Sequence, residues 1–152
     1  MEIERKFLVS NLPDSLDQYP HVEIEQGYLA SSPTIRIRRF GSSHILTVKE
    51  HLPQEGAIVN REEEFDMAES TYRQLLPKCD GRVLTKTRYR IPLDNGLVAE
   101  LDIFSGRHQG LILVEVEFPD IDAATAFMPP AWFGQDVSAD SRYRNSTLAK
   151  QH

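Results

Sequence analysis

Polar and hydrophobic side chains alternate along several short segments of this chain, a period of two that is typical of strands with two different faces. In residues 1–9, one face carries two carboxylates and an ammonium group, Glu2, Glu4 and Lys6. Free chain ends usually fray. A strand pattern at the N-terminus therefore raises the question of whether this polar face meets water or a ligand.

Seven further segments have the length, composition and bounding turns of strands. Asp94-Asn95-Gly96 between two of them is a strong hairpin signal, and Gly41-Ser42-Ser43 makes another tight connection. Their spacing is typical of an antiparallel meander. The predicted strands after the first are residues 22–30, 34–40, 44–51, 58–65, 84–91, 98–104 and 111–118.

Other segments carry helix signals. The expected helices run from Asp66 or Ser70 to about Leu76, over residues 122–128, and after Asp140 or Ser141 near the C-terminus. We therefore predict a mainly β fold with flanking helices, in the α+β class. Eight antiparallel strands are also enough to close into a barrel.

The composition is that of an ordinary globular protein, with 26% charged and 40% hydrophobic residues. A length of 152 residues suits one domain over residues 1–152. The net charge of -6 gives no sign of a general attraction to nucleic acid or membranes. The single Cys79 cannot form an internal disulfide, and no apolar run is long enough to span a membrane. We expect a cytoplasmic protein, monomeric or homodimeric.

The charged residues are sorted by strand rather than mixed. Like charges two residues apart share a strand face, at a separation of roughly 7 Å. A solvated sheet face explains any one such strand, whereas repeated like-charged pairs favour two opposed walls around a ligand. The acidic set is Glu2, Glu4, Glu100, Asp102, Glu115 and Glu117, and the basic set is Lys6, Arg36, Arg38, Lys49, Lys86 and Arg88, with Arg90 as a further candidate.

Opposed acidic and basic walls suit a ligand that is both anionic and metal-bound. Carboxylates bind hard cations such as Mg2+, and arginine and lysine bind phosphate oxygens. If the polar faces turn inward, the eight strands form a barrel with a wet, charged lumen. Burying so many charges is costly unless they are paired, solvated or ligand-bound. Such a lumen is therefore expected to be an active site.

The order of these motifs resembles that of the CYTH, or triphosphate tunnel metalloenzyme, superfamily. Glu2-Ile3-Glu4-Arg5-Lys6 matches its N-terminal Glu-x-Glu-x-Lys signature. The resemblance implies an eight-stranded antiparallel tunnel with a charged lumen and a C-terminal helix, which binds triphosphate compounds together with a divalent metal. The other motifs in the family's order are Arg36-Ile37-Arg38, Thr47-Val48-Lys49, residues 61–64, Lys86-Thr87-Arg88, Glu100-Leu101-Asp102, Glu115-Val116-Glu117 and the closing residues 136–145.

Small members similar to this chain imply hydrolysis of inorganic triphosphate to diphosphate and phosphate, with Mg2+ or alternatively Mn2+. The expected substrate-binding residues are Lys6, Arg36, Arg38, Lys49, Lys86 and Arg88. The expected metal ligands are Glu2, Glu4 and Glu117 for a first ion, with Glu100, Asp102 and Glu115 for a second ion or for the attacking water. The expected catalytic residues are Glu115, Lys86 and Arg88.

Several alternatives stay open at this point. Two alternatives are enzymes on the same fold, a class IV adenylate cyclase and a thiamine triphosphatase. A third is a non-catalytic binding module for polyphosphate or nucleotide. The six acidic lumen candidates favour metal-assisted hydrolysis over simple binding. The lining is also open at Tyr28, Glu62, Glu64 and Arg90. It is open as well at the C-terminal Arg142, Arg144 and Lys150, for which a solvated helix face is favoured over a place in the tunnel.

Overall fold

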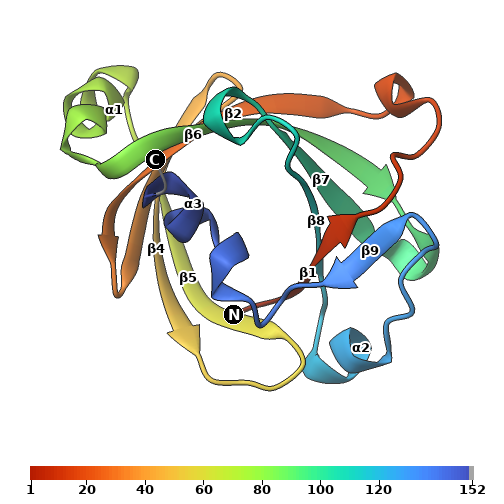
Figure 1. Ribbon diagram of the computed structural model, residues 1–152. Coiled ribbons are helices and arrows are strands. Elements are labelled where there is room, and N and C mark those ends of the chain that lie inside the picture. Colours follow the sequence, from red (N-terminus) through yellow and green to blue (C-terminus); the bar gives the residue numbers. More distant parts are fainter. Residues whose placement is uncertain (151–152) are drawn as a thin grey trace.

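Within residues 1–150, which the computed structural model describes, eight antiparallel strands close into a barrel, as predicted. The ring runs β1–β5–β4–β3–β2–β6–β7–β8 and returns to β1, and Figure 1 shows it nearly end-on. The barrel strands are β1 (Glu2–Val9), β2 (His21–Ser31), β3 (Thr34–Phe40), β4 (Ser43–Leu52), β5 (Ile58–Asp66), β6 (Asp80–Pro92), β7 (Val98–Phe104) and β8 (Ile112–Glu117).

The N-terminal strand β1 closes the ring. Glu2 pairs with Asn60 of β5 along one edge of the strand, and Glu4 pairs with Glu117 of β8 along the other. Both edges of β1 therefore have backbone hydrogen-bonding partners, which is what a chain terminus needs in order not to fray. The polar face of β1 is thereby held inside the barrel.

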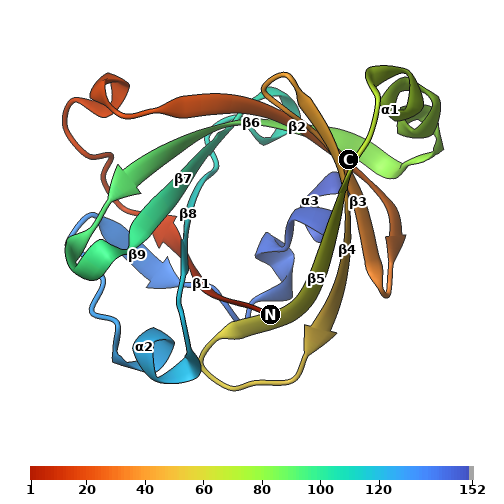
Figure 2. The same ribbon diagram turned by 180° about the vertical axis from the view of Figure 1, so that it is seen from behind.

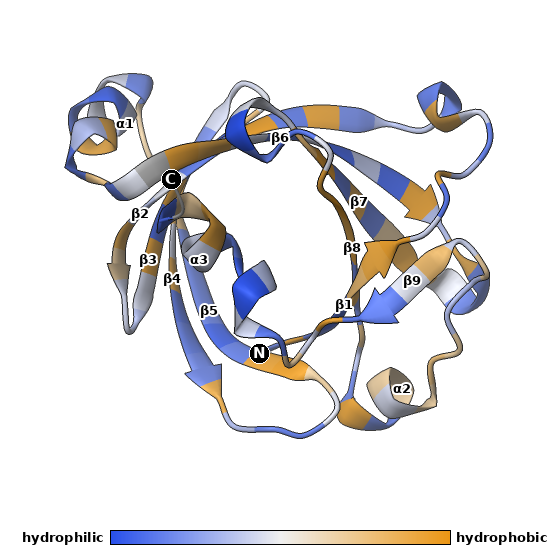
Figure 3. Ribbon diagram, in the orientation of Figure 1, coloured by the Kyte–Doolittle hydropathy of each residue, from blue (hydrophilic) through white to orange (hydrophobic). Residues whose placement is uncertain are grey.

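The apolar faces of the strands point outward, where other segments of the chain cover them. Phe7, Val114 and Val116 are at most 1% exposed, and the rings of Phe127 and Phe133 pack over this part of the wall. Burying each such side chain contributes about 1.5–3 kcal/mol. Figure 3 shows the resulting alternation of hydrophilic and hydrophobic positions along the strands. One hydrophobic core therefore lies outside the barrel wall. A second buried cluster, with Leu84, Phe104 and Leu113 on the inward strand faces, packs against the C-terminal residues Leu148 and Ala149 at one end of the barrel, and the rest of the lumen is left to polar groups.

A further strand, β9 (Phe133–Asp136), was not predicted. It takes over the β5 edge of β1 beyond the point where β5 ends, pairing at Phe7 and Val9. Four residues are too few for an alternating pattern to be recognised. Strand β6 also begins earlier than the predicted residue 84, because Asp80 pairs with Tyr28 of β2 after a register shift.

The helices are short and begin differently from the prediction. Helix α1 (Glu69–Leu75) follows Ala68, which provides no side-chain cap, so neither Asp66 nor Ser70 caps it. Helix α2 (Ile121–Ala126) is capped by Asp120, whose side chain accepts a backbone N–H of the first turn. None of the helices in residues 1–150 is both long and apolar enough to cross a membrane.

The C-terminal segment returns to one mouth of the barrel. Asp140 accepts the backbone N–H of Arg142 and begins a 3-10 turn (Ser141–Tyr143). Helix α3 (Asn145–Lys150) follows, packs against β6 and β2, and buries Leu148 and Ala149. Figures 1 and 2 view the molecule from opposite sides, and in both α3 lies within the outline of the ring.

Substituting Gly81 tests this close approach of α3 to β6. The φ angle of Gly81 is +73°, and a Cβ there would lie 2.6 Å from the carbonyl oxygen of Ala149. We expect Gly81→Ala to lower the free energy of unfolding by about 2–4 kcal/mol, through backbone strain and displacement of α3. Gly96→Ala is the matched control, because its φ is +74° but nothing lies within 4 Å. Equal losses in urea denaturation would show that the contact with α3 contributes nothing.

Candidate active site

The barrel encloses a cavity of about 830 Å3, lined by side chains from the inward faces of the strands. The structure therefore brings most of the predicted acidic and basic residues together, although they are far apart in the chain. The predicted residues that line the cavity are Glu2, Glu4, Lys6, Arg36, Arg38, Lys49, Arg88, Glu100, Glu115 and Glu117.

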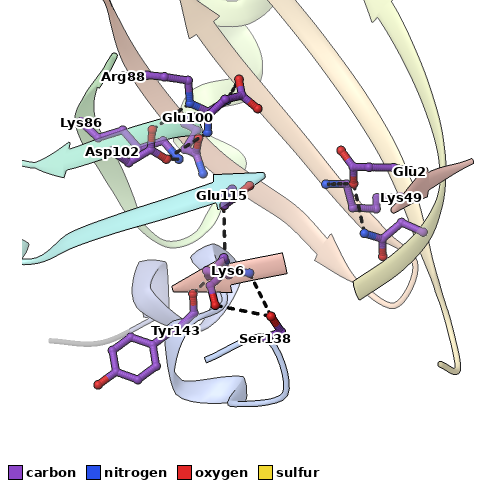
Figure 4. Close-up of polar contacts among 12 residues, drawn as sticks. Glu2, Lys6, Lys49, Lys86, Arg88, Glu100, Asp102, Glu115, Ser138 and Tyr143 are labelled. Atoms are coloured by element: carbon purple, nitrogen blue, oxygen red, sulfur yellow. Dashed lines mark hydrogen bonds and ion pairs between the residues drawn. The ribbon is translucent and has the colours of Figure 1, made fainter. Parts of the chain in front are cut away.

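Lys86 and Asp102 are the two predicted site residues that do not line it. Both are almost completely buried beside the cavity, where the Lys86 ammonium lies 2.8 Å from an Asp102 carboxylate oxygen. The ammonium also lies 5.4 Å from the centre of the Phe104 ring. Asp102 accepts two hydrogen bonds from Arg88, of 2.8 and 2.9 Å (Figure 4). Lys86 and Asp102 therefore hold the Arg88 guanidinium group in place without lining the cavity themselves.

The structure also shows which of the residues that the sequence left undecided line the cavity. Tyr28, Glu62 and Glu64 line the cavity, whereas Arg90 is exposed and forms an ion pair with Glu100. Tyr28 accepts a 2.8 Å hydrogen bond from the amide of the buried Gln26. Its own hydroxyl hydrogen is therefore free to be donated elsewhere.

Several polar lining residues were not identified as site residues from the sequence, among them Thr47, Asn60 and Ser138. Asn60 donates a 3.1 Å hydrogen bond to Glu2, and Ser138 accepts one from the backbone N–H of Lys6. Thr47 shares the strand face of Lys49, so strand parity could have indicated it. Ser138 lies in the irregular C-terminal segment, where no periodic signal could have found it.

Two arginines leave positive charge in the cavity that the protein does not fully neutralise. Among the described residues, Arg36 forms no ion pair; it donates a 3.2 Å hydrogen bond to Thr47, and its buried Nε has no partner. Arg38 forms a long ion pair with Glu64, at 3.6 Å, and its Nε is also unpartnered. Burial, Arg36 and Arg88 lower the pKa of Arg38 to about 10. An anion in this part of the cavity would relieve that strain between like charges.

The opposite imbalance exists around Glu4. Glu4 and Glu117 are direct cross-strand partners, and like charges in that arrangement destabilise a sheet. Burial, together with the nearby carboxylates of Glu115 and Glu2, raises the pKa of Glu4 well above its ordinary value. Burial and the charges of Glu2 and Glu100 also raise the pKa of Glu117. This end of the cavity therefore holds more negative charge than its surroundings compensate.

Two lysines connect the acidic and basic parts. Lys49 lies 3.0 Å from Glu2 and 3.5 Å from Glu62. Burial and Arg36 act to lower the pKa of Lys49, but Glu4, Glu2 and Glu62 outweigh them and raise it. Lys49 is therefore held as an ammonium ion between the two parts of the cavity.

Lys6 makes the second connection, to Glu115 and to the C-terminal segment. Its ammonium lies 3.6 Å from Glu115 and donates a 3.0 Å hydrogen bond to the carbonyl of Tyr143 (Figure 4). Burial acts to raise the pKa of Glu115, but Lys6, Arg88 and other nearby cations outweigh it and lower that pKa strongly. Glu115 is therefore an anion at neutral pH.

The carboxylate cluster fits a divalent cation by its chemistry. In residues 1–150, no three imidazole, thiol or carboxylate groups stand close enough together to form a finished metal site. However, carboxylate oxygens are the donors that Mg2+ prefers. A cation between Glu2, Glu4 and Glu117 would also offset the repulsion that, in addition to burial, raises the pKa values of Glu4 and Glu117.

A closed antiparallel barrel whose lumen holds uncompensated arginines and clustered carboxylates defines a class of tunnel proteins that bind polyanions together with cations. Comparison with known proteins identifies the family. The chain belongs to the CYTH domain family, whose model matches residues 1–145. The resemblance seen in the sequence motifs is thereby confirmed.

Relatives of known name cover nearly the whole chain. An inorganic triphosphatase of Nitrosomonas europaea is 43% identical over 97% of this chain and 96% of its own length. Another, from Acetivibrio thermocellus, is 34% identical over 98% and 93%. A crystal structure of an inorganic triphosphatase matches with a TM-score of 0.73 and 40% identity, covering 100% of this chain and 96% of that one.

A more distant structure shares the fold. It is a proposed adenylyl cyclase from Hippeastrum whose dominant activity is described as that of a triphosphatase. The match has a TM-score of 0.63 at 17% identity, over 80% of this chain and 81% of that one. At this identity the likeness shows the common barrel fold and no more.

Proposed function

We propose that this protein hydrolyses inorganic triphosphate to diphosphate and phosphate inside the barrel, in a reaction that depends on a divalent metal. One observation carries the proposal: the same cavity contains two arginines that the protein does not fully neutralise, Arg36 and Arg38, and a crowded carboxylate, Glu4, whose pKa is raised by burial, Glu115 and Glu2. A triphosphate anion with bound metal satisfies both imbalances at once. The named relatives, which this chain matches over nearly its full length, act on the same substrate class.

The cations of the lining bind the phosphate oxygens. Arg36 and Arg38 have the most unused donor capacity, and Lys6, Lys49 and Arg88 line the same cavity. Forked guanidinium groups bind phosphate in a fixed orientation, and preorganised cations offset the charge that develops on a transferred phosphoryl group. Lys86 acts through Asp102 and Arg88, because it lies behind the lining.

Glu2, Glu4 and Glu117 are the residues that would hold a first Mg2+ or Mn2+, and Glu100 and Glu115 border the place for a second. A bound divalent ion neutralises phosphate charge and lowers the pKa of bound water. Asp102 is already saturated by Lys86 and Arg88, so we assign it to positioning Arg88 rather than to metal binding.

Glu115 is well suited to orient the attacking water. It lines the cavity and its pKa is lowered, so at neutral pH it is a hydrogen-bond acceptor. In the hydrolysis, the water oxygen forms a bond to a terminal phosphorus while the bond from that phosphorus to the diphosphate oxygen breaks.

Because Cys79 is a free thiol, we place the reaction in a reducing compartment and propose the cytoplasm.

A phosphate-release screen tests the proposed function. The purified protein is incubated with tripolyphosphate, ATP and thiamine triphosphate, each with Mg2+, with Mn2+ or with EDTA, and the products are identified by chromatography. We expect fastest release from tripolyphosphate, with loss of activity in EDTA. Cyclic AMP as the main product would identify a cyclase, while binding without release would identify a non-catalytic phosphate-binding protein.

A further inference from the structure

The C-terminal segment contributes an arginine of its own to the cavity. Arg144, together with its neighbours Asn145 and Ser146, lines the cavity although it belongs to no barrel strand. Arg144 is also exposed to solvent. It therefore lies where the cavity opens, as the residue directly before α3. The sequence pattern favoured a solvated helix face for this residue and left a place in the tunnel as the alternative.

The backbone around Arg144 is held in a defined place. On its N-terminal side, the carbonyl of Tyr143 accepts the 3.0 Å hydrogen bond from Lys6, a cavity residue. On its C-terminal side, the carbonyl of Arg144 accepts the backbone N–H of Leu148, which is buried, and the carbonyl of Leu148 lies 2.8 Å from a ring nitrogen of His108. A side chain carried by such a segment can form a site rather than a mobile tail.

The cation of this segment that lines the cavity has no counter-ion in the protein. Among residues 1–150, the ion pairs of this segment are those of Arg142 and Lys150, and Arg144 forms none. The other two cations of the segment point to carboxylates away from the cavity, Arg142 to Asp140 and Lys150 to Asp80. Arg144 is therefore distinguished from its neighbours by both position and lack of a counter-ion.

The cavity is also large for the substrate named above. Its volume of about 830 Å3 corresponds to roughly 28 water molecules at about 30 Å3 each. The strand residues already provide five cations, Lys6, Arg36, Arg38, Lys49 and Arg88. A cation at the opening is therefore available for anionic groups that extend beyond the part of the substrate held by the strands.

We propose that Arg144 forms an additional phosphate subsite at the opening, which binds the fourth phosphate of a linear polyphosphate. The proposal rests on the proposed triphosphatase function and extends its substrate class to longer phosphate chains. Arg144 is a substrate-binding residue in this scheme, because the reacting phosphate lies deeper, among the lining cations and carboxylates. Its contribution belongs to binding and not to the chemical step.

Steady-state kinetics on tripolyphosphate and linear tetraphosphate test the subsite. We expect Arg144→Gln to raise KM for tetraphosphate about five- to tenfold, the effect of losing a charge-assisted hydrogen bond at a solvated position. KM for tripolyphosphate should change less than about twofold, and kcat should stay unchanged for both, as for uniform binding. Arg144→Lys should restore part of the affinity, since it keeps the charge but loses the fork.

Arg142→Gln is the matched control, because Arg142 lies in the same segment but does not line the cavity. Equal KM changes for the two substrates, no change for tetraphosphate, or the same change in Arg142→Gln would each overturn the subsite. Wild-type protein that does not bind tetraphosphate would overturn it as well. If the wild type does not hydrolyse tripolyphosphate, the proposed function fails instead, and calorimetric binding of both phosphates still decides whether Arg144 discriminates between them.

Discussion

Glu4→Gln is expected to reduce metal-dependent phosphate release from tripolyphosphate by about a hundred- to a thousandfold, the usual cost of removing one electrostatic group from an active site. The substitution keeps the size of the side chain and removes only its charge. Glu4 is the most crowded of the lumen carboxylates, since burial, Glu115 and Glu2 all raise its pKa. It is therefore the group that a divalent cation would relieve most.

The same variant should be more stable than the wild type in the absence of metal at neutral pH. A carboxyl group whose pKa is raised in the folded state costs stability once it ionises, as the pH rises through that folded pKa. The difference from Glu4→Gln should therefore disappear when the pH falls below the ordinary glutamate range near 4.3, where Glu4 is protonated in both states. Thermal unfolding of both proteins in EDTA, over a range of pH, measures this difference in stability.

Glu63→Gln is the control for both readouts, because Glu63 is exposed on β5 and does not line the cavity. It should change neither activity nor stability by more than about 0.5 kcal/mol. If Glu4→Gln retains full activity with Mg2+, the assignment of Glu4 to the metal is wrong. If it lowers stability instead, the carboxylate must be making a favourable contact in the folded protein.

Asp102→Asn is expected to cause the largest loss of stability of any single charge change, about 3–5 kcal/mol. Asp102 is 2% exposed and is shared by Lys86 and Arg88. Removing its charge leaves two buried cations without their common partner. Urea denaturation should show the loss, and kcat for tripolyphosphate should fall as well, because Arg88 loses the two hydrogen bonds that orient its guanidinium group.

The effect should depend on pH in a defined direction. Burial acts to raise the pKa of Asp102, but Arg88 and Lys86 outweigh it and lower the pKa. The stability that Asp102 provides is therefore present above the ordinary aspartate pKa of about 3.9 and is lost as the pH falls through the lower, folded value. The difference in the free energy of unfolding between the wild type and Asp102→Asn should therefore become smaller as the pH falls through this range.

Two comparisons separate this network from a general effect of losing a carboxylate. Asp17→Asn, at an exposed position, should leave stability within about 0.5 kcal/mol of the wild type. Adding Lys86→Met to Asp102→Asn should recover part of the loss, because it removes one of the stranded cations. A single variant Asp102→Asn that is as stable as the wild type would contradict the role assigned to this network.

Local alternation was sufficient to predict which side chains share a strand face. The period of two in a strand is a property of the backbone itself, so Glu2, Glu4 and Lys6 must lie together, as must Arg36 and Arg38. Charge then indicated the inward direction, since so many like-charged pairs make sense only around a ligand. The barrel and most of its lining could therefore be predicted before any pairing was known.

The depth of each side chain could not be predicted in this way. Lys86 and Arg88 share a strand face, yet Arg88 lines the cavity and Lys86 is buried beside it against Asp102 and Phe104. That difference depends on how β6 and β7 are staggered around the barrel. Stagger is set by pairing along the whole ring, which the sequence of one strand does not contain.

The nine N-terminal residues illustrate the same division. Their alternating pattern determines that Glu2, Glu4 and Lys6 form one polar face, because backbone geometry is local. Only barrel closure places Glu4 opposite Glu117 and brings Lys6 within reach of Tyr143. Only the return of the C-terminal segment brings Arg144 to the opening. These contacts join residues more than a hundred positions apart, and long-range pairing is decided by the packing of the whole chain rather than by any segment of it.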